Sequence, residues 1–362
     1  MKSGHKSTKS LLGGVVRALS TGRRMPGCEA ASAGKTSVMD DSLSPRRPFP
    51  TDVVHPTAVD AAQRSGPSAG RARGRRWRRS SFGLYVPRSV RLSPEQRIVE
   101  VAAAMPPGAM LTGWAALRVF GGGFFDGSDA WSKPAPVPVL VEADKRLSSS
   151  RARRVLRDRA LPQPVLFEGL WCAPPERAVI DAMRLADSGR DAVVALDMAL
   201  AAGLVSVAAV RRAWSGEIRR VGSALVRFGL RYAHDRSRSP AETRLRLVWL
   251  LDARLPSPLV NPEVRDRRGR VIGAPDLLDP RSGLVAEYDG ASHRGRDRHR
   301  VDNTRRERFL QAGLEPVTVV AGEPVAEVVR RLHAARRRAL RRSPTEHQWM
   351  YASEEREREI SA

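Results

Sequence analysis

Five residues near the carboxyl-terminal end have the types and spacing that suit chemistry on phosphate esters: Glu242, Asp276, Glu287, Asp289 and His293. Carboxylate oxygens are the ligands that Mg²⁺ and Mn²⁺ prefer in proteins. An ion of this kind activates water and stabilises the charge that develops on a phosphate during hydrolysis. We therefore expect a site for Mg²⁺ or Mn²⁺ among these side chains.

A predicted β-hairpin brings three of the carboxylates together. A turn signal at residues 279–283 separates an expected strand at 271–278 from another at 284–290. If residues 280–283 form the loop, Asp276 lies directly opposite Glu287, where side chains are about 5 Å apart and like charges are destabilising. Asp289 lies two residues further on and points to the same face. A sheet tolerates such a group when a cation lies between its members, which again indicates a metal.

Structural roles remain open for the same residues. Glu242 follows Ser-Pro-Ala and suits the last position of a capping box, in which its carboxylate accepts a backbone N–H. His293 could be a solvated loop residue, and Asp279 suits an ordinary turn position. Surface ion pairs with the abundant arginines are the alternative for the remaining carboxylates, Asp276, Glu287 and Asp289.

The elements around these residues have the order helix, three strands, helix, strand, helix. Ser239 is a helix N-cap followed by Pro240, and apolar residues three and four apart continue that helix to Leu251. The later elements are expected as strands at 259–265, 271–278 and 284–290, a helix at 301–312, a strand at 314–320 and an arginine-rich helix from Pro324. This order predicts one α/β (α+β) domain over residues 236–342.

These residues resemble the restriction-endonuclease-like superfamily, in particular a domain family related to the very-short-patch-repair mismatch endonuclease. The resemblance is carried, in order, by Ser239-x-x-Glu242, Pro275-Asp276, Glu287-Tyr288-Asp289-Gly290, His293, Asp302-x-x-Arg305 and Leu310-x-x-Gly313. It implies an αβββαβ core, with Asp276 and Glu287 as metal ligands and Glu242 as an additional ligand.

One position departs from the superfamily signature PD-x(n)-(D/E)-x-K, because Asp289 stands where the signature has lysine. No lysine follows Lys145 in the chain, so none is available nearby. The repair-endonuclease branch also lacks this lysine and relies on histidine after the motif, which implies His293 as general acid or base. The resemblance thus implies a DNA endonuclease in DNA repair or phage defence. The alternative is a non-catalytic DNA-binding regulator that retains the fold.

Composition divides the rest of the chain into three regions. Residues 1–74 are rich in Ser, Gly, Pro, Ala and Arg without a helix or strand period, which predicts a disordered basic leader. Residues 75–229 mix helix and strand signals, such as a helix start at Ser93 and a strand at 137–141, and predict a second α+β domain. Residues 343–362 are expected to be a flexible tail.

The middle region is similar to AbiEi-type antitoxins of abortive-infection systems, which often precede such a nuclease-like domain in actinobacterial proteins. The similar segments are Gly83 to Pro87, Leu111 to Leu117 and Pro174 to Asp181. Those antitoxins carry an N-terminal winged helix that binds promoter DNA, and here residues 75–90 match only its wing. The similarity implies a toxin as a second partner and a regulatory, antitoxin-like role.

Charge favours nucleic acid as the partner. The chain has 63 Lys and Arg against 39 Asp and Glu, a formal net charge of +24, and only six of the basic residues are lysines. The codon bias of a GC-rich genome also raises arginine content, so the charge supports DNA binding only in part. The arginines expected on phosphates are Arg76, Arg78, Arg294, Arg305 and Arg306, although the last two also suit helix-face ion pairs with Asp302.

Cysteine content and hydropathy exclude two classes of protein. The two cysteines, Cys28 and Cys172, are too few for a cysteine-based zinc site or a disulfide scaffold, and they favour a reducing cytoplasm. No apolar stretch reaches the roughly 18 residues that a membrane span requires. We therefore expect a cytoplasmic protein without a membrane partner; the sequence does not indicate an oligomeric state.

Overall fold

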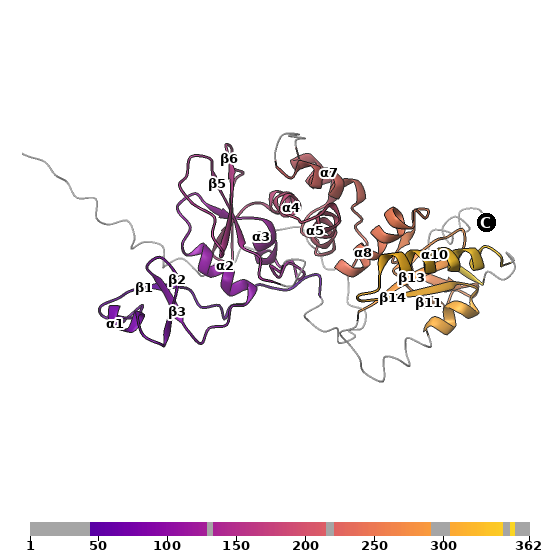
Figure 1. Ribbon diagram of the computed structural model, residues 1–362, viewed down its shortest axis with the longest axis horizontal. Coiled ribbons are helices and arrows are strands. Elements are labelled where there is room, and N and C mark those ends of the chain that lie inside the picture. Colours follow the sequence, from indigo (N-terminus) through magenta and orange to yellow (C-terminus); the bar gives the residue numbers. More distant parts are fainter. Residues whose placement is uncertain (1–43, 129–132, 215–220, 291–304, 343–347, 352–362) are drawn as a thin grey trace, which may run out of the picture. The chain divides into compact units, whose positions relative to one another are not determined.

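The computed structural model describes residues 44–128, 133–214, 221–290, 305–342 and 348–351. Within these ranges the chain is a mixed α+β protein that forms four β-sheets (Figure 1), which confirms the expected mixed α+β class. None of the helices in these ranges is long and apolar enough to cross a membrane.

The first sheet lies partly in the region expected to be a disordered leader. Its strands, in the order β1-β3-β2, are β1 (Thr57–Ala58), β2 (Trp77–Ser81) and β3 (Leu84–Pro87), and a short helix, α1 (Ala69–Ala72), precedes β2. Asp60 fixes the turn after β1, because its carboxylate accepts the backbone N–H groups of Ala62, Arg64 and Ser65. Secondary structure therefore begins before residue 74, and the expectation for residues 1–43 lies outside the described residues.

The middle domain contains a five-stranded sheet with the order β6-β5-β4-β8-β7. Its strands are β4 (Met110–Leu111), β5 (Val137–Glu142), β6 (Arg153–Asp158), β7 (Val165–Phe167) and β8 (Leu170–Cys172). Its helices are α2 (Pro94–Ala102), α3 (Gly113–Val119), α4 (Pro175–Arg184), α5 (Gly189–Ala201), α6 (Val207–Ala213) and α7 (Ser223–Tyr232). Helix α7 continues past the boundary expected at residue 229.

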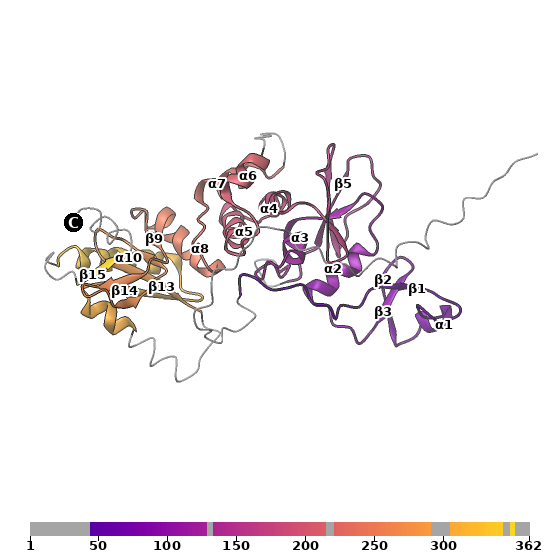
Figure 2. The ribbon, with the colours of Figure 1, turned by 180° about the vertical axis from the view of Figure 1, so that it is seen from behind.

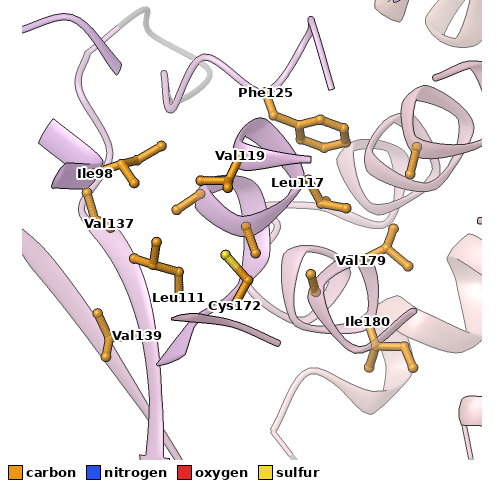
Figure 3. Close-up of a cluster of buried hydrophobic side chains, with 14 of the residues drawn as sticks. Ile98, Leu111, Leu117, Val119, Phe125, Val137, Val139, Cys172, Val179 and Ile180 are labelled. Atoms are coloured by element: carbon orange, nitrogen blue, oxygen red, sulfur yellow. The ribbon is translucent and has the colours of Figure 1, made fainter. Parts of the chain in front are cut away.

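Local sequence explains where α2 begins, and apolar burial holds it on the sheet. The Ser93 Oγ accepts the Gln96 N–H at 3.1 Å, with proline at the first helical position, as the sequence predicts. Figure 3 shows the shared core of sheet and helices, which includes Ile98, Leu111, Leu117, Val119, Phe125, Val137, Val139, Cys172, Val179 and Ile180. Each large apolar side chain buried there stabilises the domain by about 2 kcal/mol.

The C-terminal domain contains the predicted sequence of elements, but the first two predicted strands are each broken. The four pieces are β9 (Leu259–Val260), β10 (Val264–Asp266), β11 (Val271–Gly273) and β12 (Leu277–Leu278). The first break contains Asn261, at φ +48°, and Pro262, and the second contains Pro275. Neither a left-handed residue nor proline continues the hydrogen-bond ladder of a strand easily. The pieces therefore enter two sheets, β14-β13-β12-β9 and β11-β10-β15.

The hairpin between β12 and β13 (Leu284–Asp289) has the predicted register. Its observed pairs are Leu277 with Ala286 and Leu278 with Val285. Continuation of that register by one residue puts Asp276 opposite Glu287. Asp279 fixes the loop, since its carboxylate accepts the Ser282 hydroxyl at 2.7 Å and the Arg336 guanidinium at 3.0 Å. The turn role expected for Asp279 is confirmed.

Helices cover the larger C-terminal sheet. Helix α8 (Pro240–Leu247) continues as a π-helical segment, η2 (Val248–Asp252), and α10 (Val325–Ala339) lies along β13 and β14 (Glu315–Val320) in Figures 1 and 2. Trp249 and Leu332 are fully buried between these elements. Residues 305–311 are helical and connect the parallel strands β13 and β14, and Phe309 fills a second core with Val285 and Leu314.

The tail contains a strand. Residues Trp349–Tyr351 form β15, which pairs antiparallel with β10, and Trp349 is only 9% exposed against Val264, Leu278 and Phe309. The expectation of a flexible tail from residue 343 is therefore wrong for residues 348–351, because Trp349 is buried in this core and the backbone of β15 pairs with β10.

Trp349→Ala is expected to lower the free energy of unfolding by about 3 kcal/mol, since it removes a large side chain from a packed core. Urea denaturation of the full chain measures this change. The matched control is Leu340→Ala, whose side chain is 53% exposed and whose loss should change the free energy by less than about 0.5 kcal/mol. Equal effects of the two substitutions would show that β15 does not contribute to the core.

Candidate carboxylate site

Asp276 is the centre of the candidate site. It immediately precedes β12, and its Oδ2 accepts the backbone N–H of Tyr288, in β13, at 2.8 Å. Its own carbonyl oxygen accepts the Asn261 N–H at 2.9 Å. The Asp276 carboxyl is thus held at the point where the broken strands meet β13.

The electrostatic surroundings of Asp276 are unfavourable for its ionised form. Burial, which is the largest cause, and the carboxylates of Glu242 and Glu287 together raise the pKa of Asp276 to about 7. The Tyr288 N–H and the Arg305 guanidinium lower the pKa of Asp276, but by less than the other causes raise it. Glu242 and Glu287 therefore each lie close enough to Asp276 to disfavour its ionised form, and for Glu287 this agrees with the hairpin register.

Glu242 serves the helix cap as well as the site. Its N–H is accepted by the Ser239 Oγ at 3.2 Å, and its Oε2 accepts the Arg238 N–H at 2.8 Å and the Asn261 side-chain amide at 2.8 Å. The capping role left open by the sequence is therefore present, although its partner is the residue before the cap. These bonds hold the carboxylate beside Asp276 in a defined position.

A buried aspartate that sequence reasoning missed positions the helix carrying Glu242. Asp197, in α5, is completely buried and accepts the Thr243 hydroxyl at 2.9 Å, the Arg246 guanidinium at 2.7 Å and the His234 N–H at 2.8 Å. Burial is the main cause that raises the pKa of Asp197, with Arg246 opposing it. The charged pair and its hydrogen bonds hold the first turn of α8. An aspartate within the apolar run of α5 is the sequence signal for such a buried partner.

Arg305 contacts the site directly. Its Nη2 lies 2.6 Å from Glu287 Oε1 and 2.5 Å from the Ala274 carbonyl oxygen, and its guanidinium lies 5.6 Å from the centre of the Phe309 ring. The sequence favoured phosphate or Asp302 as its partner. The signal for Glu287 was available, because a helix that connects two parallel strands starts near the carboxyl end of the first, where Glu287 lies.

The remaining candidate site residues are not joined to this group by a described contact. Asp289 is exposed at the end of β13. Arg306 is exposed one residue after Arg305. His293 and Arg294 lie outside the described residues, so the roles expected for them stay predictions.

The two arginines expected on phosphates near the amino-terminal sheet differ from each other. Arg76 is exposed. Arg78 instead forms a two-pronged ion pair with Glu100 of α2, at 2.8 and 2.5 Å, because its half-buried guanidinium requires a partner. At the tip of the β2–β3 hairpin Phe82 is 91% exposed, with the Arg79 guanidinium 5.1 Å from its ring centre.

A divalent cation fits this site in donor chemistry and in charge. All the candidate ligands are carboxylates, and Glu242 and Glu287 place negative charge near Asp276, which Arg305 opposes. Among the described residues no three His, Cys, Asp or Glu side chains are grouped so as to hold a metal ion by themselves. The residues that fit are therefore Asp276 with one of the two glutamates, completed by water or phosphate oxygens, which is usual for Mg²⁺.

Comparisons with known proteins add little to this geometry. No protein-family model matches the chain, and no curated protein matches it. Among solved structures, a crystal structure of RV2827C protein from Mycobacterium tuberculosis is similar over 42% of this chain, with 17% sequence identity and a TM-score of 0.29. The similarity spans 61% of that protein, less than two thirds of its length.

Asp276→Asn is expected to stabilise the protein at alkaline pH in EDTA. The folded-state pKa of Asp276, about 7, lies above its ordinary value of 3.8, so the folded chain loses stability as the pH rises from about 4 through 7. Asparagine keeps the shape and cannot ionise. The free energy of unfolding should exceed that of the wild type by up to about 4 kcal/mol at pH 8.5, and the difference should disappear near pH 4.

Thermal and urea denaturation at the two pH values measure this difference. Asp289→Asn is the matched control and should change the free energy of unfolding by less than about 0.5 kcal/mol, because Asp289 is exposed. A variant Asp276→Asn that is less stable than the wild type at pH 8.5 would contradict the electrostatic account of the site.

Proposed function

We propose that the domain at residues 236–342 is a metal-dependent DNA endonuclease with a restriction-endonuclease-like core, which hydrolyses phosphodiester bonds with Mg²⁺ or Mn²⁺. The observation that carries this proposal is the group of carboxylates around Asp276, where burial together with Glu242 and Glu287 raises the pKa of Asp276 to about 7. A domain that only binds polyanions gains nothing from negative charge at this position. A site that binds a cation requires negative charge there.

In this proposal each residue has a defined task. Asp276 and Glu287 hold the ion, Glu242 supplements them, and Asp289 lies beside them at the end of β13. The ion, when bound, supplies activation of water and neutralises charge on the scissile phosphate. Asn261 and Arg238 hold the Glu242 carboxylate, and the Tyr288 N–H holds that of Asp276, so little reorganisation is needed when substrate arrives.

Arginine and histidine complete the proposed machinery. Arg305 neutralises Glu287 in the absence of substrate and is near enough to the site to contact a phosphate, with Arg306 exposed beside it. His293, by the resemblance to the repair endonucleases, exchanges a proton with the attacking water or the leaving group. Roles in DNA repair or phage defence follow from the same resemblance.

A non-catalytic DNA-binding, antitoxin-like regulator is the second candidate function. The ion pair between Arg305 and Glu287 favours it, because a guanidinium already occupies part of the carboxylate site. The β2–β3 hairpin also favours it, since its tip presents Phe82 beside Arg79, and apolar residues next to arginines are used by proteins that enter the minor groove.

Cleavage of DNA by the full chain separates the two candidates. With Mg²⁺ or Mn²⁺, the wild type should cut at least one of plasmid, mismatched duplex and single-stranded DNA. Asp276→Ala should reduce the rate by on the order of 10³-fold, because it removes a ligand of the ion.

The control is Asp144→Ala, which removes an exposed aspartate of the middle domain and should leave the rate unchanged. Equal rates for wild type and Asp276→Ala would contradict the enzyme proposal. If DNA is bound but not cut, and Arg76→Gln with Phe82→Ala abolishes binding, the regulator is supported.

A further inference from the structure

A polar pocket lies beside the carboxylate site, in a part of the chain to which neither the sequence motifs nor the proposed ligands extend. It has a volume of about 210 Å³ and is lined by Pro45, Ala201, Asp235, Arg236, Ser237, Arg238 and Asn261. Most of its polar lining comes from the loop between α7 and α8. The pocket is large enough for a phosphate group with part of its sugar.

Hydrogen bonds hold the loop in one conformation. The Asn261 side-chain amide donates to the Arg236 carbonyl oxygen at 2.9 Å as well as to Glu242, and His234 Nδ1 accepts the Arg236 N–H at 3.1 Å. Asn261 itself has a left-handed backbone, φ +48°, which costs an L-residue about 1 kcal/mol and is retained only where the surroundings impose it. The pocket is therefore built before any ligand arrives.

Polar groups that line the pocket can still form hydrogen bonds and ion pairs with a ligand. Ser237 is only 1% exposed, and its hydroxyl has no hydrogen-bond partner among the described residues. An unpaired buried hydroxyl destabilises a protein by about 1–3 kcal/mol. The Arg236 and Arg238 side chains are exposed, and the described part of the chain supplies no ion pair to either. Asp235, 77% exposed, is the one carboxylate in the lining, so the two arginines leave the pocket net positive.

Two guanidinium groups with a hydroxyl donor are the chemistry that recognises a phosphate. The pocket also adjoins the proposed metal site, because the Asn261 amide and the Arg238 N–H both donate to the Glu242 carboxylate. We propose that Arg236, Ser237 and Arg238 form a subsite for a backbone phosphate of the nucleic acid, adjacent to the phosphodiester at Asp276. This inference rests on the proposed function for the identity of the ligand.

The test is the affinity of the full chain for fluorescein-labelled duplex and single-stranded oligonucleotides in EDTA, measured by anisotropy over a range of salt concentrations. The double variant Arg236→Gln/Arg238→Gln should bind at least one of them about 10- to 100-fold more weakly, and the slope of log K against log salt should fall by about one to two. The matched control, Arg227→Gln/Arg337→Gln, removes two exposed arginines outside the pocket and should change the affinity by less than about threefold.

Ser237→Ala distinguishes a ligand-binding hydroxyl from a structural one. It should leave the stability of the free protein unchanged or higher, because an unpaired buried group is removed, while affinity falls about threefold to tenfold. Lower stability with unchanged affinity would overturn the assignment. Equal losses in the pocket and control double variants would overturn it as well, as would calorimetric binding of inorganic phosphate with no loss of oligonucleotide affinity in the pocket variant.

The same measurements separate this inference from the proposed function. If the wild type and the Arg236→Gln/Arg238→Gln variant bind and cut DNA equally well, the subsite alone is overturned. A chain that binds through the subsite but does not cut overturns the nuclease and leaves the subsite. A wild-type chain that binds neither oligonucleotide overturns both.

Discussion

Carboxylates gathered in a half-buried position repel one another, and the C-terminal domain is arranged around that constraint. Burial is the largest cause of the raised pKa of Asp276, and the carboxylates of Glu242 and Glu287 add to it. Each neighbour is fixed by an independent device. Asn261 and the helix cap hold Glu242, the β12–β13 register sets Glu287, and buried Asp197 anchors α8. A fold that retains such an arrangement sacrifices stability, which is typical of functional sites.

Most of the architecture could be predicted because it depends on local signals. The serine caps before α2 and α8 and the turn at Asp279 determine where elements begin and reverse, and the hairpin register followed from the loop length. The strand breaks could not be predicted. Asn261 adopts a left-handed backbone only because its side chain and N–H are bonded to three other segments of the chain. The strand at Trp349 depends on a core formed by distant residues.

The sequence predicted which carboxylates form the candidate site, but not which residues contact and hold them. Asp276 and Glu287 came together as the hairpin register required, since a two-residue period fixes which side chains share a face. The ion pair of Arg305 with Glu287 depends on where a helix lies after a long connection, and hydrophobic periodicity does not specify this. Ser237 belongs to no sequence motif, because only its burial in the folded chain distinguishes it from other serines. Only the tertiary contacts show which charged or polar residues fix the candidate site and which are exposed to solvent.

Calorimetric titration of Mn²⁺ into the full chain at pH 7, in two buffers with different heats of ionisation, measures whether a cation binds at Asp276 and how many protons it displaces. A cation bound at Asp276 must displace the proton that a pKa of about 7 leaves on the carboxyl roughly half of the time. Binding should be saturable and should release about half a proton per site, and Asp276→Asn should abolish both the Mn²⁺ binding and the proton release. Absence of binding, or binding that releases no proton and survives that substitution, would contradict a cation site at Asp276.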